Sequence, residues 1–490
     1  MKKLTILIFF TLIFQTATTA AYPSWVSYGG NPTYSNYFEG KGNITYPHVS
    51  FTGKIRGISR TLLSADINGD GSTEIIGVSL LDNSLYVFNN SLYVLWSFRE
   101  NNDTLLNTEK VSFSKISAIT IGNITGDSKP EILFSICDGR SNFSLLHAFS
   151  FNGKEMWRKK IDGRITQQSL FVGDIDFDGK NEIICGGTKL NILNGNGEIK
   201  YEYRFNINKY EGVSEILFIK DYLFVGLWSS SDVFYASRSN FYRAGDEFYL
   251  FKMRIENSTT KILWEKTLEK GSSTYYVYQS DNNFKIYIRR NKGHASLECM
   301  NMYDGSLVWR YNTEFLDLEF LPLSISKNSE IFWSIGGAVI SLTADGKLRW
   351  QRNATGPYTP DQYTGTISSF DADNDGNDEI IVIKYSGEME CLDSKKGNLK
   401  WKLNIYQNPR ESIQYFDYTP VIIHADTDND GFDEIITTDP EGRIVIIDNG
   451  TPPKENKGIS MEMLVLTGIG TIITASAVIW IWRKKRNERK

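Results

Sequence analysis

The segment DADNDGNDEII at residues 371–381 decides the fold, because the chain repeats it. DTDNDGFDEII follows at 426–436, DINGDGSTEII occupies 66–76, and DIDFDGKNEII occupies 174–184. These four copies share the pattern D-x-[DN]-x-D-G-x-x-E followed by two isoleucines, and GNITGDSKPEIL at 122–133 is a degenerate fifth copy. Neighbouring copies lie 57, 51 and 55 residues apart, a period that predicts one structural unit per copy.

A second marker trails the acidic motif: a glycine followed four residues later by an aromatic residue. The pairs are Gly153 with Trp157, Gly197 with Tyr201, Gly305 with Trp309, Gly346 with Trp350, and Gly397 with Trp401, while Trp96 and Trp264 occupy the same place without the glycine. The runs between these markers are β-branched and aromatic and are bounded by turn residues, a pattern typical of short antiparallel strands. Little helix is expected, because no long segment between the two ends of the chain shows a 3.6-residue period.

The markers also give the number of units. Trp264, Trp309 and Trp350 lie between Tyr201 and Trp401, which gives three units whose acidic loops have decayed. The unit that starts at residue 426 ends near residue 450 without its aromatic, and we expect Trp25 to supply it from the other end of the chain. A last unit completed by the N-terminus hides the final sheet edge. The prediction is an all-β fold, a closed β-propeller of eight blades, with seven blades, an open solenoid or tandem sandwiches as alternatives.

The acidic motif predicts cation sites. Side chains at positions 1, 3, 5 and 9 of a tight loop can converge on one ion, and the glycine at position 6 permits the turn. Asp, Asn and Glu offer the hard oxygens that Ca²⁺ prefers, whereas Mg²⁺ would demand a stricter octahedron. An EF-hand is excluded because it needs Glu at position 12 and flanking helices. Position 12 here is instead Gly77, Cys185, Val382 or Thr437.

Four calcium sites are therefore predicted, with a weak fifth. The candidate ligands are Asp66, Asn68, Asp70 and Glu74; Asp174, Asp176, Asp178 and Glu182; Asp371, Asp373, Asp375 and Glu379; Asp426, Asp428, Asp430 and Glu434; and, in the weak site, Asn123, Thr125, Asp127 and Glu131. Acidic turns that hold no metal are the alternative interpretation. No catalytic residue and no organic cofactor is predicted.

The two ends of the chain predict export and anchoring. Residues 1–21 combine two lysines, an apolar run and a small-residue cleavage zone, the pattern of a signal peptide. Residues 463–482 are uncharged and long enough to span a bilayer, and the basic tail at 483–490 is expected to be cytoplasmic. The predicted organisation is thus a 22–450 ectodomain, a 451–462 linker, one transmembrane helix and a short tail, in a single-pass protein of the cell membrane.

Charge and composition narrow the partners. The chain carries a net charge of −5, but the part between the two ends has 45 basic and 56 acidic residues, or −11. Such a surface disfavours nucleic acid and anionic lipid as partners. Eight N-x-S/T sequons are candidate glycan sites: Asn43, Asn89, Asn102, Asn123, Asn142, Asn257, Asn353 and Asn449. The 4 Cys and 4 His exclude a disulfide-stapled module and a His- or Cys-rich metal enzyme, and free buried thiols are expected.

These features carry a family resemblance. The acidic loops resemble the FG-GAP/VCBS-type calcium loops of integrin α-subunit-like propellers. The Gly-x-x-x-Trp markers and the opening WVSYGGN at 25–31 resemble the quinoprotein-dehydrogenase-like (PQQ-repeat) eight-bladed propellers. The likeness covers residues 22–450 and implies a propeller fold and bound calcium. Such propellers serve in adhesion, as envelope scaffolds and in a few enzymes.

Three functions are consistent with this sequence. The first is a membrane-anchored, calcium-binding surface protein for adhesion or for binding an extracellular protein or glycan. The second is an envelope scaffold that docks a partner protein. The third is an extracellular enzyme of quinoprotein-dehydrogenase or polysaccharide-lyase type, for which the acid–base candidates are His48, His147, His294 and His424. No adjacent Cys pair of the kind found in some quinoproteins occurs, and His424 is expected to be structural.

Overall fold

The computed structural model describes the residues 36–100, 114–138, 142–207, 210–219, 221–229, 234–236, 241–243, 248–256, 259–268, 278–280, 285–292, 294–315, 323–326, 328–335, 337–354, 362–406 and 420–451. The chain divides into two compact units, 1–449 and 450–490, and the first contains every strand described. The predicted signal peptide, Trp25, the sequons at Asn102 and Asn257, the linker from residue 452 on, the 463–482 segment and the tail lie outside the described residues. Within them, no helix has both the length and the apolar character needed to cross a membrane.

Four antiparallel sheets of four strands follow one another along the first half of the chain, and we call them blades 1 to 4. Their strands are β3 (Ile58–Ala65), β4 (Glu74–Ser79), β5 (Ser84–Phe88) and β6 (Val94–Arg99); β7 (Ser114–Gly122), β8 (Glu131–Asp138), β9 (Phe143–Phe149) and β10 (Glu155–Asp162); β11 (Leu170–Gly173), β12 (Glu182–Cys185), β13 (Leu190–Leu193) and β14 (Ile199–Tyr203); and β15 (Tyr210–Ile219), β16 (Tyr222–Ser229), β19 (Phe248–Glu256) and β20 (Thr259–Leu268). A separate hairpin, β17 (Phe234–Ala236) with β18 (Phe241–Arg243), lies between β16 and β19 in sequence. The one helical element described is the 3₁₀ turn Gln167–Ser169.

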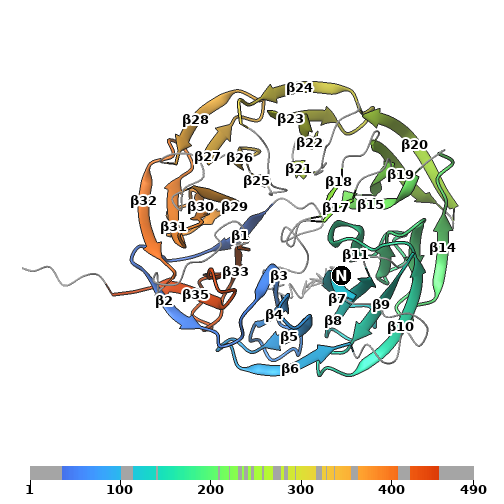
Figure 1. Ribbon diagram of the computed structural model, residues 1–490, viewed down its shortest axis with the longest axis horizontal. Coiled ribbons are helices and arrows are strands. Elements are labelled where there is room, and N and C mark those ends of the chain that lie inside the picture. The colour runs from blue at the N-terminus through green and yellow to red at the C-terminus, as the bar shows by residue number, and fades with distance from the viewer. Residues whose placement is uncertain are drawn as a thin grey trace, which may run out of the picture. The chain divides into compact units, whose positions relative to one another are not determined.

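Blades 5 to 8 continue the same arrangement. Their strands are β21 (Tyr278–Ser280), β22 (Lys285–Lys292), β23 (His294–Asn301) and β24 (Leu307–Asn312); β25 (Leu323–Ile325), β26 (Ile331–Ile335), β27 (Ala338–Leu342) and β28 (Leu348–Asn353); β29 (Tyr363–Asp371), β30 (Glu379–Lys384), β31 (Glu388–Asp393) and β32 (Leu399–Asn404); and β33 (Ile423–Ala425), β34 (Glu434–Thr438) and β35 (Ile444–Asn449). The sheets stand around a ring with β6, β10, β24 and β32 among the strands at its rim (Figure 1). This is the predicted eight-bladed β-propeller, so seven blades, an open solenoid and tandem sandwiches are all wrong.

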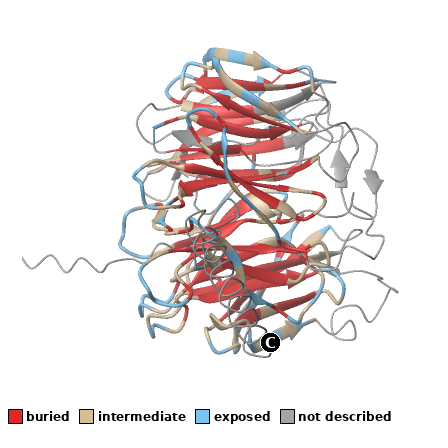
Figure 2. Ribbon diagram, turned by 90° about the vertical axis from the view of Figure 1, so that its left-hand side faces the viewer, coloured by how far each residue is buried: buried red, intermediate tan, exposed pale blue. Residues whose placement is uncertain are grey.

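The hydrophobic pattern explains which strand lies where. The two isoleucines that follow each complete acidic motif lie in the second strand of a blade, directly after the glutamate that begins it, and the strands β4 and β34 are buried at every position. Strands at the rim alternate instead, as in β32, where exposed and half-buried residues take turns. Figure 2 shows the result, with buried residues running through the strands and exposed residues on the loops. A continuous apolar run therefore predicts a buried inner strand, and an alternating run predicts a strand at the rim, because the rim strand has one face in water.

The glycine–aromatic markers are contacts between neighbouring blades. The indole N–H of Trp350, on the rim strand of blade 6, donates a 2.8 Å hydrogen bond to the carbonyl oxygen of Ser394 in blade 7. Gly397 of blade 7 has a φ of +71°, and a Cβ there would lie 2.6 Å from the Trp350 ring. The same donation runs from Trp96 to Phe151, Trp157 to Gly195, Trp264 to Met302, Trp309 to Ala344, and Trp401 to Ile44. Each glycine therefore makes room for the tryptophan of the preceding blade.

A one-residue bulge precedes the aromatic on each of these rim strands. In blade 7, Trp401 pairs with Cys391 and Leu399 pairs with Leu392, so that Lys400 between them has no partner. The equivalent bulge residues are Leu95, Met156, Lys200, Leu263, Val308 and Arg349 in blades 1 to 6, and Ser50 in blade 8. A bulge re-aims the side chain of the extra residue, and we call this place the bulge position.

The N-terminal segment closes the ring. Strand β2 (Pro47–Thr52) pairs with β35 and is the rim strand of blade 8, which confirms that the last blade is completed by the other end of the chain. Phe51 pairs with Ile446 at the place that other blades give to tryptophan or tyrosine, so the predicted role of Trp25 falls to Phe51. Strand β1 (Tyr37–Lys41) pairs in parallel with β29, on the inner side of blade 7 (Figure 1).

The cysteines are structural. All four thiols are free, as expected, and Cys185, Cys299 and Cys391 lie in the core. Burial raises the pKa of the Cys185 and Cys391 thiols far above its usual range, because the thiolate would be charged in an apolar environment. These groups are therefore unreactive core residues.

Candidate metal centre

The acidic loops join the innermost strand of a blade to its second strand, and their own carboxylates shape them. In blade 7, Asp371 accepts hydrogen bonds from the backbone N–H groups of Asp375 and Gly376, both at 3.0 Å. Asp174 accepts the equivalent bonds in blade 3, and Asp66 accepts three such bonds in blade 1. In blade 8, Asp426 accepts from the backbone N–H groups of Asn429 and Gly431. The first position of the motif therefore ties the loop into a tight turn, with the glycine at position 6 at positive φ.

The glutamate at position 9 is buried at the base of each loop. Glu379 is 1% exposed and accepts a 2.9 Å hydrogen bond from the backbone N–H of Ala372. The same bond reaches Glu74 from Ile67, Glu131 from Ile124, Glu182 from Ile175, and Glu434 from Thr427. Position 9 thus begins the buried second strand and still presents an oxygen to the loop.

The loop of blade 8 gathers the most negative charge. Asp426, Asp428, Asp430 and Glu434 each place an oxygen within 4.8 Å of the others. Burial, aided by the charges of Asp428 and Asp448 and opposed by hydrogen bonds from Thr427, raises the pKa of Glu434 to about 8. Among the described residues no lysine or arginine forms an ion pair with these four carboxylates. Their mutual repulsion is the electrostatic condition that a divalent cation relieves, so these four residues could hold a metal ion.

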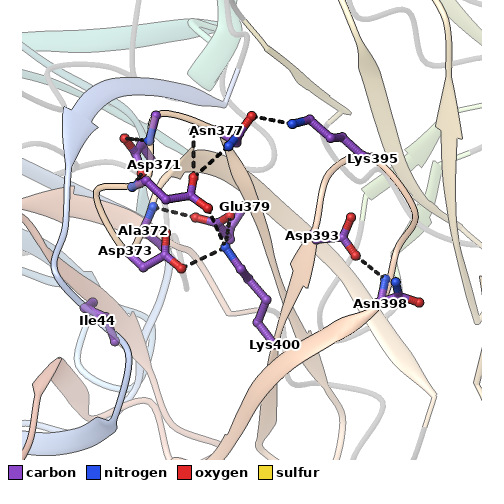
Figure 3. A network of polar contacts seen from close by, with 12 residues as sticks. Ile44, Asp371, Ala372, Asp373, Asn377, Glu379, Asp393, Lys395, Asn398 and Lys400 are labelled. Carbon is purple, nitrogen blue, oxygen red and sulfur yellow. Dashed lines mark hydrogen bonds and ion pairs between the residues drawn. The ribbon is translucent and has the colours of Figure 1, made fainter.

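The loops of blades 3 and 7 contain a lysine instead. Lys400 Nζ lies 2.7 Å from Asp373, 2.5 Å from Glu379 and 3.4 Å from Asp375 (Figure 3). In blade 3, Lys200 Nζ lies 3.0 Å from Asp176, 2.7 Å from Glu182 and 3.4 Å from Asp178. Although burial lowers the pKa of either lysine, hydrogen bonds and the charges of the surrounding carboxylates outweigh it and raise the pKa. The ammonium group therefore occupies the place that the prediction assigned to a metal ion.

Sequence reasoning missed these two lysines, although a signal was present. Both stand immediately before a marker aromatic, at the bulge position. Arg349 occupies the same place in blade 6 and reaches Glu330, the remnant of a decayed loop, at 2.5 Å. A basic residue directly before the marker therefore predicts that the loop of that blade contains an internal cation.

The other two predicted sites are weaker. In blade 1, the Asn68 side-chain amide donates a 2.9 Å hydrogen bond to Glu74, and burial raises the pKa of Glu74 to about 7. In blade 2, Thr125 donates to Glu131 at 3.1 Å and Asn123 accepts from the backbone N–H of Gly126. In neither loop do three carboxylates converge among the described residues.

The described histidines have structural surroundings. His424 is fully buried, its ring centroid lies 4.0 Å from that of Phe370, and burial lowers its pKa to about 3. His147 is equally buried, stacked on Phe134 with centroids 5.1 Å apart, and lies 3.0 Å from Glu155. The expectation of a structural role for His424 is confirmed. His48 and His294 each contact a backbone carbonyl oxygen on the surface.

Comparison with known proteins supports the fold. The model of a family described as the lambda-carrageenase beta-propeller domain matches residues 331–419, which include blade 6 from β26 on and all of blade 7. No curated protein matches the sequence.

Solved propellers superpose over most of the chain. A quinohemoprotein alcohol dehydrogenase from Comamonas testosteroni is 10% identical with a TM-score of 0.57, and the match covers 90% of this chain and 83% of the enzyme. A europium-containing methanol dehydrogenase is 11% identical with a TM-score of 0.55, covering 84% and 89%. BamB from Moraxella catarrhalis is 13% identical with a TM-score of 0.47, covering 80% and 99%. At these identities the likeness to the two dehydrogenases shows a shared fold alone and leaves function to the residues of the site.

Proposed function

We propose that this protein is a calcium-stabilised β-propeller of the cell surface that binds an extracellular protein or glycan. The observation that carries the proposal is the convergence of Asp426, Asp428, Asp430 and Glu434 within 4.8 Å, in a loop with no lysine or arginine paired to them among the described residues. Ca²⁺ takes six to eight oxygen ligands and tolerates irregular geometry, which suits a loop of mixed carboxylates better than Mg²⁺ does.

Calcium at this loop would reinforce ring closure. Asp433, in the same loop, accepts a 2.9 Å hydrogen bond from the backbone N–H of Lys41, and its own backbone N–H donates to the Lys41 carbonyl oxygen at 2.8 Å. Lys41 ends β1, and the chain then continues to β2, the strand that completes blade 8. A cation that orders the loop therefore also orders the segment that holds the first and last blades together.

Export and anchoring belong to the same proposal. The signal-peptide pattern at 1–21 and the apolar segment at 463–482 support a single-pass membrane protein with the propeller outside. A rigid ring carried on one anchor presents loops to partners, and the net charge of −11 between the two ends favours cations and uncharged or basic ligands. The likeness of residues 331–419 to a carrageenase propeller domain favours polysaccharides as the first ligands to test, and the acidic surface makes sulfated ones the harder case.

The calcium part is tested by melting the full-length protein in detergent with CaCl₂ and with EDTA. We expect a higher melting temperature in calcium, because an ion that binds only the folded state stabilises it by mass action. The variant Asp428→Ala, which removes a ligand oxygen, should melt at the same temperature in both conditions. If the wild-type melting curve is the same in calcium and in EDTA, the calcium part of the proposal is wrong.

The ligand part is tested with the calcium-loaded protein on arrays of glycans, including sulfated galactans, and on extracellular matrix proteins. Saturable binding that EDTA weakens supports a surface receptor. Co-purification of one membrane protein at fixed stoichiometry would support the scaffold alternative. Shortening of the polysaccharide, or reduction of a dye with quinone and an alcohol, would replace the binding proposal with an enzymatic one.

A further inference from the structure

We infer that Lys200 and Lys400 are built-in counterions, so that the loops of blades 3 and 7 stay closed without a divalent cation while the loop of blade 8 requires one. The inference rests on the proposed calcium binding, and it deepens that proposal by assigning which of the similar loops take the ion. Three of the four complete motifs bring three or more carboxylates together, yet only that of blade 8 does so without a lysine.

The geometry around Lys400 is that of a cation among its ligands. Its ammonium group has three donors, and three carboxylates of the loop surround it at 2.5 to 3.4 Å (Figure 3). Glu379, the shortest contact, is 1% exposed. A carboxylate buried this deeply needs a partner, because burying an unpaired charge is strongly unfavourable.

Blade 3 repeats the arrangement with different neighbours. Lys200 approaches Asp176, Asp178 and Glu182 at 2.7 to 3.4 Å, and Glu182 is again 1% exposed. Two blades that are not adjacent in the ring thus use a lysine at the same register position for the same contact. Arg349 makes the corresponding contact to Glu330 in blade 6, where the remaining motif residues are missing.

The bulge position explains why blade 8 differs. Its residue there is Ser50, whose hydroxyl donates to the backbone carbonyl of Ile446 at 3.2 Å. Serine brings no charge, so the four carboxylates of the 426–434 loop have no internal cation from this position. The chemistry of a loop is therefore decided by a residue on the far strand of the blade.

A lysine and a calcium ion exclude each other in one such loop. Both would contact the same oxygens, and a divalent ion a few ångströms from an ammonium group is repelled by it. Calcium could enter the blade 7 loop only after Lys400 left and exposed its charge elsewhere. Lysine therefore acts as a selectivity device that keeps calcium out of two of the four loops.

The experiment counts bound calcium in the full-length protein by equilibrium dialysis against CaCl₂ followed by metal analysis. Asp428→Ala should lower the count by one per chain, whereas Asp373→Ala and Asp176→Ala should leave it unchanged. Lys400→Met, which keeps the length of the side chain and removes its charge, should raise the count by one. Arg349→Met is the matched control, because its loop contributes only Glu330 and should gain no ion.

Melting provides the second measurement. Lys400→Met should melt at a lower temperature than wild type in EDTA, because Asp373 and Glu379 lose their partner, and CaCl₂ should restore the lost stability. A lower calcium count in Asp373→Ala or Asp176→Ala, or no gain in Lys400→Met that folds, would overturn the inference. A wild-type protein that binds no calcium would overturn the proposed function instead, while a gain in Lys400→Met would still support the lysine's role.

Discussion

Single charged residues decide local chemistry in this molecule, and Glu390 is the clearest example outside the loops. It is 3% exposed, and Lys384 Nζ at 2.7 Å, the Tyr363 hydroxyl at 2.7 Å and Arg352 Nε at 3.3 Å surround it. Burial alone would raise the pKa of Glu390, but the hydrogen bonds and charges of these neighbours outweigh it and lower the pKa. Glu390 is therefore ionised in the folded protein near neutral pH.

Lys384→Met is expected to destabilise the fold by about 3 kcal/mol at pH 7, because it leaves Glu390 buried with less compensation. The stability that ionised Glu390 contributes is present above its unfolded pKa of 4.5 and is lost as the pH falls through the lowered folded value. The difference in unfolding free energy between the variant and the wild type should therefore become smaller as the pH falls from 7 toward 4. Urea unfolding of both proteins at pH 7 and at pH 4 measures this difference.

Lys402→Met is the matched control. Lys402 pairs with Glu388 at 2.9 Å, but its side chain is 58% exposed. Its loss should cost less than about 1 kcal/mol, as is usual for surface pairs. Equal losses from the two variants would show that burial of Glu390 is not the cause.

At the scale of the element, the blade is a sheet that cannot be stable alone. Both faces of its inner strands are buried, and a tryptophan on its rim strand contacts the next blade. The bulge beside that tryptophan serves two contacts at once, because it aims the aromatic toward the neighbouring blade and the bulge residue toward the acidic loop of its own. Blade packing and loop chemistry are thus coupled through one irregularity in the rim strand.

Gly397→Ala tests the contact between blades. Gly397 has positive φ and lies against Trp350, so the added methyl group should destabilise the protein by about 2 to 4 kcal/mol through backbone strain and overpacking together. Gly376→Ala shares the positive φ but has open space around its Cβ, and it should cost only the backbone term of about 1 to 2 kcal/mol. The difference in unfolding free energy isolates the contact, and two equal values would mean that the indole moves aside without cost.

At the scale of the whole molecule, the seam at which the ring closes departs from the tryptophan–glycine pattern. Phe51, 47% exposed, stands where other blades have tryptophan or tyrosine. In the following blade, Leu92 has a φ of +59° at the place of the marker glycine, in a turn closed by the same hydrogen bonds as the turn of Gly153. A leucine at positive φ is strained. The seam between blades 8 and 1 has therefore exchanged a tryptophan–glycine pair for a phenylalanine–leucine pair.

Restoring the pair should show this exchange. Phe51→Trp alone should destabilise the ring, because Leu92 stands where the tryptophan–glycine seams have the glycine that makes room for the indole, and Leu92→Gly alone loses packing. The double variant should lose less unfolding free energy than the two single variants together, by about 1 kcal/mol or more. Chemical denaturation of all four proteins measures these losses. Additivity within about 0.5 kcal/mol would contradict the equivalence of this seam with the others.

Repetition made most of the fold predictable. The motif at 66–76 and its copies gave the period, the aromatic markers gave the number of blades, and the missing marker after residue 426 predicted closure by the N-terminus. These inferences succeeded because strand depth and turn position depend on local residue types, which every unit repeats. The identity of the closing strand was missed, because β2 carries Phe51 in place of the expected tryptophan.

The repeated motif and its markers were enough to predict the propeller, its eight blades and the residues that line each acidic loop. What those residues face could be seen only in the folded chain, since Lys200 and Lys400 lie on the rim strand, 18 and 21 residues from the glutamates that they contact. A β-bulge aims each lysine at its loop, so that its Nζ lies 2.5–2.7 Å from a carboxylate oxygen of the glutamate. The local sequence predicts which carboxylates a loop offers. The lysine that pairs with them lies on another strand, and its position depends on how that strand is paired in the sheet.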